Sequence, residues 1–137
     1  MRAKNQQLKR VLLVCSRGCD RVENDLHHAG YRVIKVTDGA VAIERAKHER
    51  LNAAVLISTG RQMDLAETAL NLKDINSSVE IIIVVGSDVA GEKAAQTAAI
   101  VRALPETSVV TVGEFDRYLA SLETKERRVI RTKATAK

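Results

Sequence analysis

Apolar residues along this chain alternate between short continuous runs and helically spaced stripes. Five runs have the length of strands and are rich in Val, Ile and Leu: 11–14, 31–36, 53–57, 80–85 and 109–112. Five further segments repeat apolar residues at helical spacing: 20–29, 40–50, 64–75, 88–104 and from 114 onward. The fourth of these helical segments stops before Pro105, the only proline of the chain.

Strand runs that are apolar at nearly every position are typical of strands buried on both faces of a parallel sheet. Helical segments between them are long enough to cross over the sheet. The sequence therefore predicts an α/β fold, a doubly wound five-stranded parallel sheet with helices on both faces. In such folds a site lies beyond the carboxyl ends of the strands. The loops expected there are 15–20, 58–63, 86–88 and Gly113.

Charge divides the chain into three parts. The net charge is +5, but residues 1–10 hold four basic and no acidic side chains, and residues 122–137 hold six basic and two acidic ones. The part between them is therefore mildly acidic. We expect a basic N-terminal arm (1–8), a globular domain (9–122) and a basic C-terminal tail or linker (123–137). An acidic domain with three aromatic residues argues against a nucleic-acid face.

The expected location is the cytoplasm, without membrane association. No apolar run approaches the roughly 18 residues of a membrane span, and the basic start of the chain is not followed by a signal-peptide core. In that compartment Cys15 and Cys19 are expected as reduced thiols, the first buried and the second half-exposed. A disulfide or a redox role for them depends on loop geometry, which the sequence does not give.

Three stretches of the chain are similar to a known family. KRVLLV at the first strand, NAAVLI at the third and the intervening AGYRV, TDG and AIERA resemble the receiver domain of bacterial response regulators. RQMDLAETALNLK and EIIIVVG extend this similarity, which covers roughly residues 9–122. The resemblance implies the flavodoxin-like (βα)5 receiver architecture. The matching residues are core and turn positions, so they speak for fold rather than activity.

The resemblance also implies where a phosphorylation pocket belongs. Receivers place two acids after strand 1, an acceptor Asp at the end of strand 3, a Thr or Ser after strand 4 and a Lys after strand 5. Carboxylates bind Mg²⁺, the Asp attacks phosphorus, and the hydroxyl and Lys hold the phosphoryl group. The corresponding positions here are Cys15, Ser16, Ile57 (Ser58 if the strand is one residue longer) and Val85, with Val112–Gly113 at the lysine position.

With these groups replaced, we expect a pseudo-receiver with no enzymatic activity, no metal and no cofactor. Its expected function is phosphorylation-independent signal transduction through binding of a protein, either a different protein or a second copy of the chain. The resemblance implies docking through the helix 4–strand 5–helix 5 surface. The candidate residues on that surface are Gln96, Arg102, Glu106, Glu114, Arg117 and Tyr118.

Two other functions fit the first loop. Cys15 and Arg21 have the C-x5-R spacing of a cysteine phosphatase or arsenate reductase, and the loop resembles that of low-molecular-weight tyrosine phosphatases. Val22 stands where that family has a hydroxyl, however, and no later Asp-Pro general acid exists. The alternative is a small-anion or nucleotide site at the helix start, although no glycine-rich nucleotide motif is present.

Acidic residues near the helix starts have a structural interpretation. Asp20 and Glu23 are predicted to form a capping pair at the first helix, and Asp64 to cap the third. Gly30 is predicted to end the first helix.

Overall fold

The structure is a computed structural model that describes residues 9–15, 18–57, 65–85 and 92–122. Side chains of 92–96 are outside that description. The strands are β1 (Arg10–Val14), β2 (Arg32–Val36), β3 (Ala53–Ile57), β4 (Glu80–Val85) and β5 (Ser108–Thr111). The helices are α1 (Asp20–His28), α2 (Gly39–His48), α3 (Leu65–Ile75), α4 (Glu92–Ala103) and a C-terminal helix over 115–122, which follows a 3₁₀ turn at Val112–Glu114.

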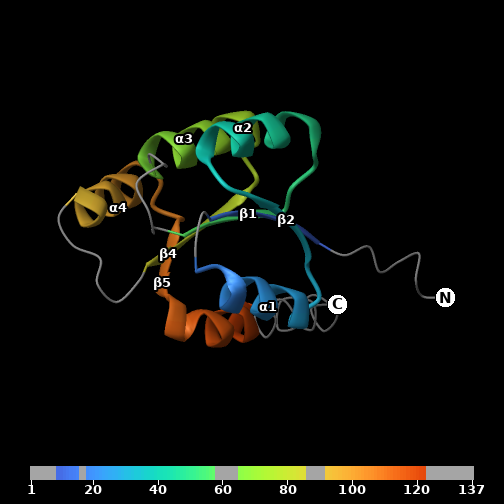
Figure 1. Cartoon of the computed structure of the whole chain (residues 1–137). Helices are drawn as coiled ribbons and strands as arrows, with labels where there is room; N and C mark the ends of the chain where they lie inside the picture. Colours follow the sequence, from blue (N-terminus) through green and yellow to red (C-terminus); the bar gives the residue numbers. More distant parts are fainter. Residues whose placement is uncertain (1–8, 16–17, 58–64, 86–91, 123–137) are drawn as a thin grey trace, which may run out of the picture.

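All five strands are parallel and form one sheet in the order β2-β1-β3-β4-β5. Helices cover both faces, with α2, α3 and α4 on one side and α1 and the C-terminal helix on the other (Figure 1). The predicted doubly wound α/β fold is therefore confirmed. The order reverses direction at β1, so the carboxyl ends of β1 and β3 meet at the position where this fold binds ligands.

The sheet separates two hydrophobic cores because side chains of a strand alternate between its faces. Leu12 and Val14 pack with α2, α3 and α4, whereas Val11, Leu13 and Cys15 pack with α1 and the C-terminal helix. The central strands supply both cores, and every residue of β3 is buried. This two-sided burial explains why the sequence shows continuous apolar runs rather than alternation.

Helix α1 ends as predicted but starts differently. Gly30, at φ +92°, follows the helix, and the amides of Gly30 and Tyr31 donate to the carbonyls of His27 and Leu26 at 3.0 Å each. This is a Schellman motif, which glycine accommodates without strain. The predicted capping pair of Asp20 and Glu23 is wrong, because Asp20 is already the first helical residue.

The residue at the start of α1 is Cys19, and no side chain caps the helix there. Helix α2, in contrast, has a side-chain cap, since Asp38 Oδ1 accepts from the Val41 amide at 2.9 Å. The cap predicted at Asp64 lies outside the described residues.

Candidate functional site

The carboxyl edge of the sheet carries an apolar row of residues. The strand register pairs Val14 with Leu56, and Cys15 is the next residue along β1. On β3, the residue after Leu56 is Ile57, and it pairs with Val84 on β4. All three residues of this row, Cys15, Ile57 and Val84, are buried in the core beneath α1 and the C-terminal helix.

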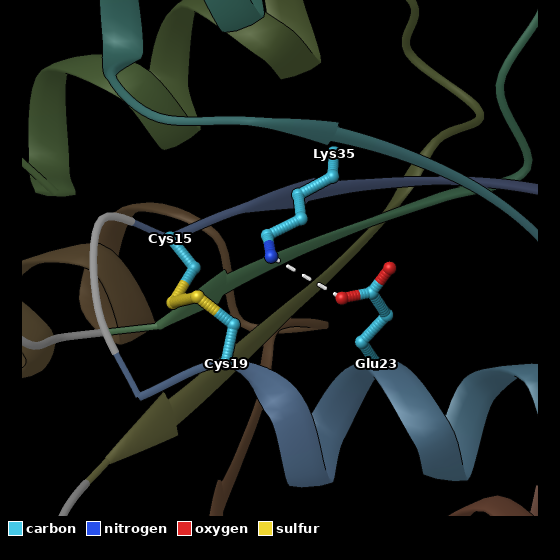
Figure 2. Close-up of a disulfide and its surroundings, with 4 residues drawn as sticks. All are labelled: Cys15, Cys19, Glu23 and Lys35. Carbon is cyan, nitrogen blue, oxygen red and sulfur yellow. Dashed lines mark hydrogen bonds and ion pairs between the residues drawn. A yellow bond between two sulfur atoms is a disulfide. The ribbon is translucent and has the colours of Figure 1, made fainter.

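Cys15 and Cys19 form a disulfide at this edge, with their Cα atoms 6.1 Å apart (Figure 2). The bond joins the end of β1 to the residue that starts α1. The two residues are only 2% and 5% exposed. The expectation of two reduced thiols, one of them half-exposed, is therefore wrong. Cys19 lies in the same core as Cys15.

The helix start is linked to the sheet by a second contact next to the disulfide. Lys35 Nζ on β2 donates to Glu23 Oε1 on α1 at 3.2 Å (Figure 2). Glu23 thus pairs with a lysine of the sheet instead of capping its own helix. Beneath the disulfide, the Cys15 amide donates to the Val36 carbonyl at 3.0 Å, which extends the β1–β2 ladder by one bond.

The positions of the receiver pocket that the structure describes are apolar or disulfide-bonded. The sequence resemblance assigns Cys15 to the first acidic position, Ile57 to the acceptor position and Val85 to the hydroxyl position; Ile57 is 1% exposed and Val85 is partly buried. Val112 packs against the core at the lysine position. Ser16 and Ser58 lie outside the described residues. Side chains of this kind offer no oxygen for Mg²⁺ and no carboxylate nucleophile.

Within residues 9–15, 18–57, 65–85 and 92–122, no group of three or more His, Cys, Asp or Glu side chains is arranged to hold a metal ion. Three hollows in the described part lie at the opposite, amino edge of the sheet. One of about 150 Å³ lies between Val11, Asn52 and Leu119, and an open groove of about 680 Å³ runs along the ends of α2 and α3. A third, of about 190 Å³, lies beside Lys73 and Glu106.

The phosphatase hypothesis needs a thiolate at Cys15 with Arg21 gripping phosphate. In the structure the Cys15 sulfur is bonded to that of Cys19, and Arg21 is exposed on the first turn of α1. A sulfur in a disulfide has no thiolate. In this state Cys15 therefore cannot act as the nucleophile.

The candidate partner surface is only partly a free surface. Arg102, Glu106 and Arg117 are exposed. Glu106 lies 3.6 Å from Lys73 in an ion pair, and Glu114 is held in a capping box with Thr111. The sequence signal for that box, Thr-Val-Gly-Glu, was available but was missed. The side chain of Gln96 lies outside the description.

Tyr118, the aromatic member of that surface, is partly buried. Its hydroxyl donates to Ser108 Oγ at 2.9 Å and lies 3.4 Å from Glu80 Oε2. Burial raises the pKa of Tyr118 above its ordinary value of 10.0, and the nearby Glu80 charge raises it further, while the Ser108 bond lowers it. Through its hydroxyl, Tyr118 therefore links the C-terminal helix to Glu80 on β4 and Ser108 on β5.

Comparison with known proteins gives a clear result for the fold. No protein-family model and no curated protein matches the sequence. Among solved structures, a CheY-like response regulator receiver domain protein from Methanospirillum hungatei has a TM-score of 0.67 at 18% identity, covering 93% of this chain and 98% of that one.

Two further solved structures are similar. The signal receiver domain of an HD domain-containing protein from Pseudomonas fluorescens has a TM-score of 0.71 at 14% identity, over 95% of this chain and 94% of that one. A Burkholderia pseudomallei response regulator with a phosphorylated aspartic acid has a TM-score of 0.64 at 16% identity, over 92% and 73%.

The chain therefore has the fold of response-regulator receiver domains, as its sequence resemblance implied. Among the described residues, no helix is long and apolar enough to cross a membrane.

Proposed function

We propose that this chain is a phosphorylation-independent signal-transduction module that acts in the cytoplasm by binding another protein. The receiver fold supports a role in signalling. The observation that carries the proposal is the apolar, disulfide-bonded row at the carboxyl edge, which contains Cys15 and Ile57. The sequence resemblance assigns these two residues to positions where receivers have carboxylates. Phosphoryl transfer needs positioning and charge stabilisation, and neither side chain supplies them.

The loss of one group can be compensated, but several are replaced together. Val85 offers no hydroxyl, and Val112 no ammonium group, at the positions where a phosphoryl group is held in receivers. An ionised acceptor between Cys15 and Val84 would also lie in a hydrophobic core, where an unpaired charge is strongly disfavoured. These replacements favour a module whose function does not pass through an aspartyl phosphate.

The test is incubation with acetyl phosphate and Mg²⁺, followed by intact-mass spectrometry under conditions that preserve acyl phosphates. We expect no phosphoryl adduct on this chain. The Burkholderia pseudomallei response regulator, whose solved structure carries a phosphorylated aspartic acid, serves as the positive control. A stoichiometric adduct on this chain would overturn the proposal.

The protein partner is proposed to bind the surface formed by α4, β5 and the C-terminal helix. Arg102 and Arg117 are exposed there and take part in no capping interaction of the described part. Reversal of both charges, Arg102→Glu with Arg117→Glu, is expected to weaken binding to the partner. Sedimentation measures the case in which the partner is a second copy of the chain. The matched control is Arg50→Glu, an exposed change between α2 and β3. Equal effects of the two changes would exclude this surface.

A further inference from the structure

The disulfide at the carboxyl edge uses every cysteine of the chain. The sequence contains two, and Cys15 and Cys19 are bonded to each other. Their Cα separation of 6.1 Å is within the range that a disulfide bridges without movement of the backbone. In a cytoplasmic protein such bonds are usually transient, catalytic or redox-sensing rather than permanent.

We propose that Cys15 and Cys19 form a reversible redox site, at which thiol–disulfide exchange with a dithiol controls the start of α1. The inference rests on the proposed function, because it assigns regulation to the edge from which phosphorylation chemistry has been lost. The site is a covalent link between the central sheet and a helix, and its two states differ in whether that link exists (Figure 2).

The exchange balances in atoms and electrons. A thiolate of the external dithiol bonds to one sulfur of the pair as the Cys15–Cys19 bond breaks, and the other sulfur leaves as a thiolate. The second thiolate of the dithiol then attacks the mixed disulfide. The products are two protonated cysteines and an oxidised, cyclic or protein disulfide. Oxidation is the same reaction in reverse, with a disulfide as the oxidant.

The position of Cys19 suits this chemistry. Cys19 precedes the first turn of α1, and a helix N-terminus favours negative charge, so Cys19 is the better leaving sulfur. The carboxylate of Glu23, one turn later, is paired with Lys35, which offsets its charge.

Solvent reaches the backbone beside Cys19. Gly18 is exposed, with φ +67°, and a Cβ added there would meet no atom within 4 Å. The chain next to Cys19 is therefore in contact with solvent, although both cysteines are buried.

The first turn of α1 depends on the bond. No side chain caps that turn, so the disulfide is the covalent restraint that holds its first residue against the sheet. Its first helical hydrogen bond runs from the Glu23 amide to the Cys19 carbonyl at 2.8 Å. With the disulfide open, the charged link left is the Glu23–Lys35 pair, whose side chains are 28% and 40% exposed. Local opening of the turn is then easier.

The experiment equilibrates the folded protein with buffers of reduced and oxidised dithiothreitol and quenches the exchange with acid. After removal of dithiothreitol, the thiols are labelled with N-ethylmaleimide in urea at pH 7 and the intact mass is measured. A reversible transition between no label and two labels is expected when the exchange itself is free of denaturant. Hydrogen exchange at the Glu23 amide is expected to be faster by about tenfold or more in the reduced form. A variant with Cys15→Ser and Cys19→Ser takes no label and should show the Glu23 exchange rate of the reduced form in every buffer.

Two outcomes overturn the inference. One is a disulfide that resists reduced dithiothreitol in the folded protein but yields to it in urea, and the other is equal exchange at Glu23 in both states. The acetyl phosphate experiment, repeated on the reduced and oxidised forms, separates this failure from that of the proposed function. A phosphoryl adduct removes the proposed function, whereas an unreactive disulfide without an adduct removes only the redox site.

Discussion

Lys35 on β2 and Glu23 on α1 form an ion pair, 3.2 Å between Nζ and Oε1, directly beside the Cys15–Cys19 disulfide (Figure 2). One helix is thus joined to two neighbouring strands, by an ionic contact to β2 and by a covalent bond to β1. The two links differ in burial. The ion pair is partly solvated, while the disulfide lies in the core, so their contributions to stability are expected to differ.

Removal of the ion pair is expected to have a small effect. Lys35→Met should lower the free energy of unfolding by less than about 1 kcal/mol, since solvent screens a partly exposed pair. Urea unfolding at low and high salt concentration measures this, and the loss should shrink at high salt. Glu23→Gln is the matched variant. A loss that is larger and independent of salt would mean that Lys35 acts through packing.

Removal of the disulfide is expected to cost more. For the five-residue loop from Cys15 to Cys19, the chain-entropy relation predicts that opening the bond lowers the free energy of unfolding by about 2 kcal/mol. The comparison is between oxidised wild type, reduced wild type and the Cys15→Ser, Cys19→Ser variant in urea unfolding. Reduced and oxidised wild type of equal stability would contradict this expectation.

Placing an acid at the expected acceptor position should destabilise the fold and should not restore phosphorylation. Ile57→Asp places a carboxylate at a residue that is 1% exposed, which we expect to cost about 3 kcal/mol or more. Ile57→Val, the control for lost volume, should cost about 1 kcal/mol. Because the metal-binding acids are still missing, Ile57→Asp should give no adduct with acetyl phosphate; an adduct would show that position 57 alone was limiting.

Stability should fall at alkaline pH through Tyr118. Burial raises the pKa of Tyr118 above 10.0 in the folded state, so the folded protein keeps the phenol proton to higher pH than the unfolded chain does. The contribution is complete below pH 10.0 and is lost as the pH rises through the folded value. Tyr118→Phe should flatten the decline above pH 10 seen in urea unfolding of the wild type.

The same substitution has a second effect at neutral pH. Tyr118→Phe removes the hydroxyl that donates to Ser108 and should lower stability by about 1 kcal/mol. Absorbance titration near 295 nm tests the pKa directly, because Tyr31 and Tyr118 are the two tyrosines and the chain has no tryptophan. A midpoint for Tyr118 at or below 10.0 would contradict the argument.

The fold was predictable because its signals are local. Continuous apolar runs mark strands that are buried on both faces, and Gly30 marks a helix end through its positive φ. Such features depend on a few neighbouring residues. The strand ranges from the pattern agree with the structure to within a residue at each end.

The site was less predictable because it depends on one-residue shifts and long-range contacts. Asp20 was expected to cap α1 but is its first helical residue. The residue at the cap position is Cys19 instead. The partner of Glu23 is 12 residues away on β2, and that of Tyr118 is ten residues away on β5. Neither the Cys15–Cys19 bond nor these pairs follow from spacing alone.

Opening the disulfide between Cys15 and Cys19 would also differ from phosphorylation in the charge that it adds to this edge of the sheet. An aspartyl phosphate would carry about two negative charges, roughly one more than the carboxylate it replaces, and their field reaches roughly 8 Å through physiological salt. Opening a disulfide to two protonated thiols adds no charge. A change at this edge would therefore act on α1 through its contacts with the sheet, without the long-range field of a phosphate.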